Sequence, residues 1–236
     1  MAMLTDFHSH ILPGMDDGSA SVEESLQMLR MEAQQGIRHV VATPHFYPRY
    51  DSPEKFLQKR AQAVEQLCKE LEKHQGLPQI TVGAEVYYFQ GMSESEILPQ
   101  LTIGGDGCIL IEMPHGHWSE EMYRELAAIW EKQRILPIIA HIDRYIEPFH
   151  THGIPKKLAE LPVYVQANAD FFLERSTAGM AMRMLKADQI QLIGSDCHNM
   201  DSRKPNMGEA VARIERKFGT AALETIRRYE EKVLRV

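Results

Sequence analysis

Seven short apolar segments recur along the chain of 236 residues, and they constrain the fold more than any other feature. Each is apolar at consecutive positions, which is typical of strands buried on both faces in a parallel sheet. Segments with helical periodicity separate most of them, so the sequence predicts an α/β fold with helices covering the sheet. The predicted strands start at residue 3 and then cover residues 39–45, 80–86, 108–112, 136–140, 163–168 and 190–195. The predicted helices cover residues 21–36, 52–74, 119–133, 177–186, 208–217 and 220–234.

Histidines and carboxylates follow at least six of these strands, at the carboxyl end of each. An open sheet would spread such side chains along a wide edge, whereas a closed barrel brings all of its strand ends to one mouth. The pattern therefore predicts a barrel with its functional site at the C-terminal ends of the strands. No shift in composition, repeat or low-complexity linker divides the chain, so we expect residues 1–236 to form a single domain.

Charge and hydropathy exclude several classes of protein. The formal net charge is -7 and there is no basic run, which argues against a surface for duplex nucleic acid. No apolar stretch reaches the length that spans a bilayer, and the N-terminus lacks the pattern of a secretory signal. We therefore expect a soluble, cytoplasmic protein with no direct membrane insertion. The three cysteines are widely spaced, which favours free or buried thiols over a disulfide framework.

Two histidines at the end of the first strand, His8 and His10, suggest a metal site. Residues two apart in a strand point to the same side, so both imidazoles can face one ion. Similar residues at the later strand ends complete a set of five imidazoles and four carboxylates without a thiolate. The set is His8, His10, Asp17, His45, Glu85, Glu112, His141, Asp196 and His198.

This ligand set suits Mn, Fe or Zn, and it exceeds what one tetrahedral ion can use. Two or three divalent ions are therefore expected, and a carboxylate such as Glu85 could bridge two of them. Taken singly, each residue has a simpler explanation, since a lone carboxylate after a strand is usually a helix cap and a lone histidine is usually a hydrogen-bonded surface or core residue. Together they are harder to explain without a cation, because burying many unpaired charges is costly.

Two arginines, Arg144 and Arg203, each follow a candidate ligand by a few residues. Planar guanidinium groups match a phosphate bidentately, and they would explain how an acidic protein holds an anion. The alternative is a local ion pair with Asp143 or Asp201.

The motifs around these residues resemble those of the polymerase-and-histidinol-phosphatase (PHP) superfamily. Within it, the chain is most similar to the bacterial manganese-dependent protein tyrosine phosphatases of capsule and exopolysaccharide clusters. The resemblance extends in order from the first strand to Arg203. It rests on residues 8–18 (HSHILPGMDDG), 43–45 (TPH), 83–88 (GAEVYY), 139–145 (IAHIDRY) and 195–199 (SDCHN).

The resemblance implies a distorted TIM-like (β/α)7 barrel with three metal ions, Mn being the expected metal and Fe or Zn possible substitutes. One ion would be held by His8, His10, Glu85 and Asp196, a second by Glu85, Glu112 and His141, and a third by Asp17, His45 and His198. A tyrosine-phosphorylated bacterial tyrosine kinase that controls polysaccharide synthesis is the implied substrate and partner.

The implied mechanism is an in-line attack on phosphorus by a hydroxide that bridges the metals. Arg144 and Arg203 would stabilise the charge on the phosphoryl oxygens. An Asp or His beside the metals could protonate the leaving oxygen, so Asp17, His45 and His198 are candidate catalytic residues as well as ligands.

Three other functions stay open at this point. Cys197 and Arg203 match the C-x5-R pattern of cysteine-dependent tyrosine phosphatases, but the adjacent Asp196 would raise the thiol pKa and the stretch between them has no Gly. The metal barrel could instead hydrolyse a small phosphomonoester such as histidinol phosphate. Finally, the protein could be a non-enzymatic, metal-stabilised partner of the kinase.

Overall fold

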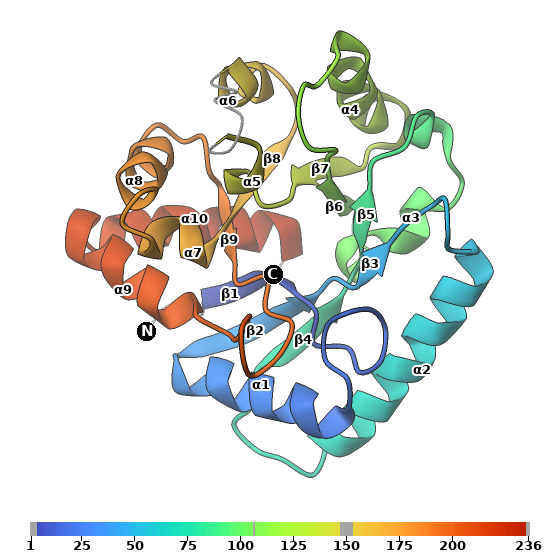
Figure 1. Ribbon diagram of the computed structural model, residues 1–236, viewed down its shortest axis with the longest axis vertical. Coiled ribbons are helices and arrows are strands. Elements are labelled where there is room, and N and C mark those ends of the chain that lie inside the picture. The colour runs from blue at the N-terminus through green and yellow to red at the C-terminus, as the bar shows by residue number, and fades with distance from the viewer. Residues whose placement is uncertain (1–3, 106, 147–152, 235–236) are drawn as a thin grey trace.

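Parallel strands form a ring at the centre of the computed structural model, which describes residues 4–105, 107–146 and 153–234, and helices surround the ring (Figure 1). One sheet has the strand order β1-β2-β4, and the other has the order β3-β5-β6-β7-β8-β9. Every pair in both sheets is parallel. The first sheet comprises β1 (Leu4–Ser9), β2 (Ile37–Ala42) and β4 (Gln79–Val82). The second comprises β3 (His45–Phe46), β5 (Glu85–Tyr87), β6 (Cys108–Glu112), β7 (Leu136–Ile139), β8 (Tyr164–Asn168) and β9 (Leu192–Gly194).

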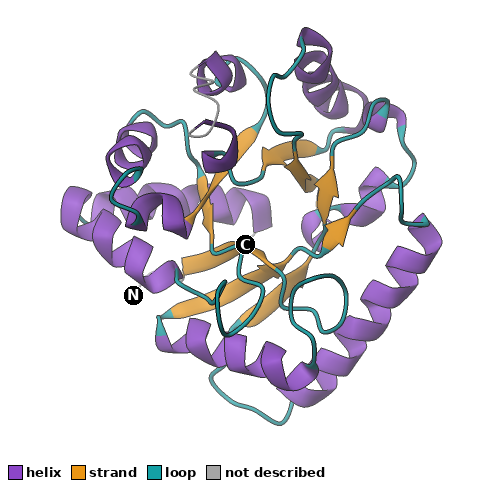
Figure 2. Cartoon of the chain, viewed as in Figure 1, coloured by secondary structure: helices purple, strands orange, loops and turns teal. Residues whose placement is uncertain are grey.

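The barrel closes where the last strand meets the first. The backbone N–H of Asp196 donates to the carbonyl of His8 at 2.7 Å, and the N–H of His10 donates to the carbonyl of Cys197 at 2.9 Å. The sequence prediction of a closed barrel rather than an open sheet is therefore confirmed, and Figure 2 shows the ring of strands inside its layer of helices.

Two strands that the sequence predicts as continuous are each broken in two. The segment 39–45 divides into β2 and β3, and the segment 80–86 divides into β4 and β5. Pro44 has no N–H to donate to a sheet, which explains the first break. At the second break, a Cβ on Gly83 would lie 3.0 Å from Cγ1 of Ile103, so a larger residue here would crowd the Ile103 side chain. The N–H of Gly83 donates to the carbonyl of Ala42 at 2.9 Å and that of Glu85 to the carbonyl of Pro44 at 3.0 Å, so the pairing continues across both breaks.

Side chains of the strands alternate between two apolar layers. Leu110 and Ile138 belong to the cluster inside the barrel, whereas Ile109 and Ile139 belong to the larger cluster between strands and helices. This alternation is the period of two expected for a strand, and both faces are apolar because both are covered. Glu112 follows Leu110 by two residues and therefore lies on the inner side, at the mouth.

The longer helices match the predicted segments to within a few residues. They are α1 (Val22–Gln34), α2 (Pro53–Leu71), α4 (Glu120–Gln133), α8 (Ala178–Lys186), α9 (Met207–Phe218) and α10 (Thr220–Leu234). The hydroxyl of Ser21 accepts from the N–H of Glu24 and caps α1. None of the described helices combines the length and the apolar character that crossing a bilayer demands.

Shorter helical segments were not predicted, because one turn carries too little periodicity to stand out in a sequence. They are η1 (Met92–Glu94), α3 (Leu98–Leu101), η2 (Ile103–Gly105), α5 (Asp143–Ile146), α6 (Gly153–Leu158) and α7 (Ala169–Leu173).

Stability should depend on pH through Glu230, a buried residue of α10 whose carboxylate accepts from the N–H of Thr5 in β1. Burial raises the pKa of Glu230 to about 8, although the contact with Thr5 lowers it. A carboxyl group with a raised pKa contributes full stability below its unfolded pKa, and this contribution is lost as pH rises through the folded value. The Glu230→Gln variant keeps an acceptor but cannot ionise. It should therefore match the native protein at pH 5 and exceed its melting temperature at pH 8.

Calorimetry at both pH values measures this difference. Glu224→Gln, which alters an exposed residue of the same helix, is the matched control and should not show the trend. An equal difference in melting temperature between Glu230→Gln and the native protein at pH 5 and pH 8 would contradict the raised pKa of Glu230.

Candidate metal centre

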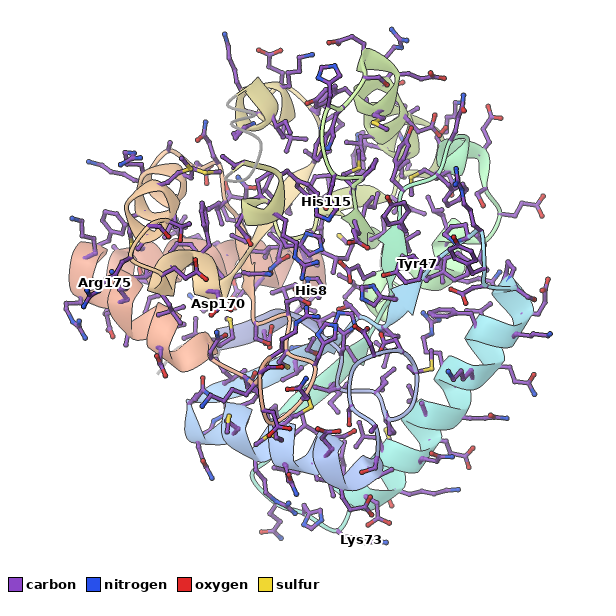
Figure 3. The ribbon with its side chains drawn as sticks, in the orientation of Figure 1. His8, Tyr47, Lys73, His115, Asp170 and Arg175 are labelled. Carbon is purple, nitrogen blue, oxygen red and sulfur yellow. The ribbon has the colours of Figure 1, made fainter. Side chains whose placement is uncertain are left out.

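The structure brings all nine candidate ligands together at the barrel mouth. His8 and His10 come from the end of β1, His45 and Glu85 open β3 and β5, and Glu112 ends β6. The remaining four lie in the loops that follow strands β1, β7 and β9. They are Asp17, His141, Asp196 and His198. In Figure 3, His8 lies near the centre of this mouth.

A first group surrounds a single point between β1, β5 and β9. The Nε2 atoms of His8 and His10 are 3.1 Å apart, and they lie 3.2 and 3.4 Å from Oε2 of Glu85. Both Nε2 atoms are 3.5 Å from Oδ1 of Asp196. Two nitrogens bound at ~2.1 Å to one ion lie about 3.0 to 3.4 Å apart at ordinary coordination angles, so the spacing suits a shared metal.

Glu85 connects this group to a second one. Its other oxygen, Oε1, is 2.7 Å from Nε2 of His141, which is 3.8 Å from Oε1 of Glu112. Because its two oxygens face different groups, Glu85 has the geometry of a carboxylate that bridges two ions.

The third group contains Asp17, His45 and His198. Oδ1 of Asp17 is 3.6 Å from Nε2 of His45 and 3.5 Å from Nε2 of His198. His10 borders this group as well, since its ring centroid is 3.8 Å from that of His198. Asp17 is the exposed member, with 69% of its side chain accessible, whereas the other two are largely buried.

Three histidines present an Nε2 lone pair to the centre because Nδ1 faces an acceptor. Nδ1 of His8 faces Oε1 of Gln166 at 3.2 Å, Nδ1 of His10 faces Asp16 at 2.8 Å, and Nδ1 of His198 faces the carbonyl of Asp196 at 2.9 Å. A proton on Nδ1 leaves Nε2 free to bind a metal, which is the arrangement that outer hydrogen bonds impose on metal-binding histidines.

Buried polar atoms at the centre lack hydrogen-bond partners among the described residues. They include Oε2 of Glu85, Oε2 of Glu112 and Nε2 of His198. Such atoms are rare in folded proteins because an unpaired buried polar group is costly, and a bound cation satisfies them. The residues therefore fit divalent ions.

The charge balance within the centre points the same way. Burial, and next the Glu85 carboxylate, raise the pKa of Glu112 to about 7. Burial lowers the pKa of His141 to about 4 and that of His198 to about 4, so both imidazoles are in the neutral form that binds metals. Burial also opposes the charged form of His8, but Glu85 and Asp196 outweigh it and raise its pKa.

The backbone is strained at two of the candidate ligands. His141 has a φ of 32° and Asp196 a φ of 55°, in the region that favours glycine. Such strain persists only where surrounding contacts hold it, and it is concentrated at functional sites. Close packing adds a further constraint, because a Cβ on Gly194 would lie 2.5 Å from the Cβ of His8.

Sequence reasoning missed the residues that hold the ligands in place. Asp16 accepts from Nδ1 of His10, from the N–H of His45 at 2.8 Å and from the N–H of Gly18 at 2.9 Å. Burial alone would raise the pKa of Asp16, but these contacts, His10 foremost, lower it to about 2. Asp16 is thus an ionised acceptor that fixes two ligands at once.

Gln166 and Asn168 of β8 have a similar role. Oε1 of Gln166 accepts from the N–H of His141 at 2.6 Å, and Nδ2 of Asn168 donates to Oδ2 of Asp196 at 3.1 Å. A signal was available, since two polar residues at spacing two end a strand that is otherwise apolar.

Arg144 and Arg203 both reach Asp196 at the rim of the centre. Nη2 of Arg203 is 2.8 Å from Oδ1 of Asp196, and Nη2 of Arg144 donates to Oδ2. Their side chains stay 31% and 37% accessible, so both guanidinium groups face the mouth. The alternative pairs with Asp143 or Asp201 are not among the ion pairs of the described residues. A tight loop places Arg203, whose carbonyl accepts from the N–H of His198 at 2.8 Å.

Cys197 does not have the surroundings of a nucleophile. It is buried at 1% exposure, and burial followed by the charges of Asp6 and Glu32 raises its pKa well above the ordinary thiol value. A nucleophilic cysteine needs the opposite, a partly exposed site that favours the thiolate. The geometry therefore argues against the C-x5-R reading.

Comparison with known proteins agrees with this geometry. The sequence matches the family described as "Capsular polysaccharide synthesis, CpsB/CapC" over residues 4–235. The chain belongs to the CpsB/CapC family.

Named relatives and a solved structure are similar to this chain. It is 30% identical to the tyrosine-protein phosphatase CpsB of Streptococcus agalactiae serotype III, covering 92% of this chain and 91% of the relative. Identity to the tyrosine-protein phosphatase YwqE of Bacillus subtilis is 29%, covering 92% and 86%. A crystal structure from work on YwqE and Streptococcus pneumoniae CpsB, described as unique metal-dependent tyrosine phosphatases, matches with a TM-score of 0.87. That match has 26% identity and covers 98% of this chain and 94% of the other.

Removing the Asp16 charge should weaken metal binding although Asp16 is not a candidate ligand. Asp16→Asn loses the carboxylate that orients His10 and His45, and loss of such an outer partner typically costs about 10- to 100-fold in metal affinity. Titration of chelator-stripped protein with Mn, followed by metal analysis, measures this. Asp201→Asn, in an exposed loop, is the control. Native affinity in Asp16→Asn would contradict the role.

Proposed function

We propose that this chain is a metal-dependent protein tyrosine phosphatase. The observation that carries the proposal is the cluster around Glu85, a buried glutamate with imidazoles on both of its oxygens and two arginines at the rim. Membership of a family whose named relatives are tyrosine-protein phosphatases supports the same activity.

The three groups of side chains define how the centre would hold divalent ions. His8, His10, Glu85 and Asp196 would bind one, and Glu85, Glu112 and His141 a second. Asp17, His45 and His198 would bind a third. Mn is our first choice, with Fe or Zn as alternatives, because nitrogen and oxygen ligands without thiolate suit all three. When bound, such ions supply Lewis acidity and lower the pKa of a water molecule toward neutrality.

The protein's own residues then position and stabilise the phosphate. Arg144 and Arg203 face the mouth from one side, where their planar donors can bind the non-bridging oxygens as negative charge develops. Asp17, His45 and His198 would lie beside the leaving oxygen, and a phenolate needs little protonation to leave. Asp17 is the most exposed of these three, so it meets substrate without a change in the fold.

The family description, capsular polysaccharide synthesis, supports a biological setting. We propose that the substrate is a tyrosine-phosphorylated bacterial kinase acting in capsule or exopolysaccharide synthesis, and that dephosphorylation takes place in the cytoplasm. We also propose that residues 1–236 act as one PHP-type domain.

Two other functions make different predictions. A phosphatase for a small phosphomonoester would turn over histidinol phosphate faster than a phosphotyrosine peptide. A metal-stabilised binding partner would hold metal and turn over neither. Kinetics with both substrates on the same metal-loaded preparation separates all three.

Activity should depend on metal and not on Cys197. Hydrolysis of a phosphotyrosine peptide should vanish when the protein is stripped by a chelator and return when Mn is added. Cys197→Ser should retain most of the activity because the thiol is buried and its raised pKa disfavours the thiolate. Loss of turnover in Cys197→Ser with normal metal content would instead support a cysteine mechanism.

Loss of one arginine should lower kcat more than it affects metal content. Removing a single donor to transition-state charge typically costs about 10² to 10³ in kcat, so we expect a loss of that order for Arg203→Ala. Arg203→Lys should recover only part of it, because an ammonium group cannot donate bidentately. Steady-state kinetics and metal analysis on the same samples test this, with the exposed Arg175→Ala as control. Unchanged kcat in Arg203→Ala would exclude the phosphate role.

A further inference from the structure

An aromatic groove of about 620 Å³ lies beside the metal centre. Its lining comes from the loops after β3, β5 and β6, together with α4. Tyrosine and phenylalanine side chains dominate the lining, and the residues used below are Tyr47, Arg49, Tyr50, Tyr87, Phe89 and Pro114.

The groove continues directly from three candidate ligands. Tyr47 follows His45 by two residues, Tyr87 follows Glu85 by two, and Pro114 follows Glu112 by two. Residues two apart in an extended chain point to the same side, so these three residues extend the lining of the metal centre into the groove.

Ring contacts confirm this continuity. The ring of Tyr47 stacks on that of His45, with centroids 5.0 Å apart and planes 28° apart. The ring of Tyr87 lies 5.8 Å from that of Tyr47 and is tilted by 46° to it. An aromatic wall therefore begins at a candidate metal ligand and continues into the groove.

The groove and the arginines lie on different sides of the centre. Arg144 and Arg203 line a separate polar pocket of about 540 Å³ that also contains Asp170. Figure 3 shows Asp170 and Tyr47 on opposite sides of His8. A phosphotyrosine whose phosphate binds between the metals and the arginines would therefore point its ring and its main chain toward the groove.

The size of the groove exceeds what one ring can fill. A cavity of about 150 Å³ accommodates benzene, so the groove has room for a tyrosyl ring and several neighbouring residues. A small phosphomonoester would leave most of the apolar lining exposed to water.

Arg49 gives the groove a positive charge, and Tyr50 forms its exposed edge, which we call the lip. Arg49 is the one charged residue of the lining, and none of the ion pairs among the described residues includes it. Tyr50 is 87% exposed, the most accessible large apolar side chain in the described part of the chain. Exposed aromatics beside a groove, together with an arginine, are typical of the residues that contribute most to binding a polypeptide.

We propose that the aromatic groove binds the polypeptide on either side of the phosphotyrosine in the substrate protein. Tyr50 packs against an apolar or aromatic side chain of that polypeptide, and Arg49 pairs with an Asp or Glu close to the phosphotyrosine. The inference rests on the proposed phosphatase function and adds what the substrate segment contains: acidic and apolar residues on either side of the phosphotyrosine.

Kinetics with two substrates tests the groove. One substrate is a phosphotyrosine peptide with flanking Asp, Glu and apolar residues, and the other is p-nitrophenyl phosphate, which cannot reach the lip. An aromatic contact contributes about 0.5 to 1.5 kcal/mol, so Tyr50→Ala should lower kcat/KM for the peptide by about 2- to 12-fold, through KM. The ratio of kcat/KM for the peptide to that for the small substrate should fall by the same factor.

Matched controls separate the groove from a general loss of folding. Trp130→Ala removes another exposed aromatic, on α4 outside the groove, and Arg175→Ala removes a distant exposed arginine. Neither should change the ratio. An equal loss on both substrates in Tyr50→Ala, or a fall of the ratio in the controls, would overturn the proposal.

Charge reversal gives a sharper test of Arg49. Arg49→Glu should prefer a peptide with Lys in place of the acidic neighbours, whereas the native protein should prefer the acidic peptide. A purely structural role for Arg49 cannot invert this preference, so an unchanged order would overturn the assignment.

A binding measurement that needs no turnover separates the groove proposal from the proposed phosphatase function. The acidic peptide carrying a non-hydrolysable phosphonate in place of the phosphate can be followed by fluorescence anisotropy. Weaker binding in Tyr50→Ala and Arg49→Glu, but not in the controls, supports the groove even if the protein shows no phosphatase activity. Equal binding by all variants overturns the groove while leaving the proposed function intact.

Discussion

The closure of β9 against β1 is the constraint on which the rest of the structure depends. Asp6 binds both strands: its Oδ1 accepts from the N–H groups of His8 at 3.1 Å and Ser195 at 2.8 Å, and its Oδ2 accepts from the Ser195 hydroxyl at 2.5 Å. Gly194 lets the strands approach until a methyl group would no longer fit. Without this closure, His8 and His10 would lie far from Asp196 and His198, because the two pairs come from opposite ends of the chain.

Closure also brings buried carboxylates and imidazoles together at the barrel mouth. Glu85 and Asp196 are buried among imidazoles, and several of their neighbours' polar atoms lack hydrogen bonds in the described chain. The backbone is strained at His141 and Asp196 in this arrangement. Hydrogen-bond acceptors behind the ligands, Asp16 among them, hold it in place. Bound cations would stabilise such a buried, pre-positioned set, so we expect metal binding to add to the stability of the fold.

The two sides of the barrel mouth differ in chemistry, and this difference bears on which substrate can bind. Arginines on one side suit the charged end of a phosphoester, while the wall that starts at Tyr47 suits its apolar end. Barrels of this kind host many reactions, so the fold by itself does not select one phosphoester. In our interpretation the loops after β3, β5 and β6, rather than the ligands, decide which phosphoester reaches the centre.

The sequence by itself determined the alternation of strands and helices, the barrel and the nine residues that meet at its mouth. This was possible because strand ends of a parallel barrel converge, so position along the chain predicts position in space. Only the tertiary structure decided how those residues divide into groups and which oxygen of Glu85 faces which histidine. The same holds for the breaks at Pro44 and Gly83, for the roles of Asp16, Gln166 and Asn168, and for the aromatic groove. These depend on contacts between segments far apart in sequence, where side-chain geometry, not local pattern, decides which atoms meet.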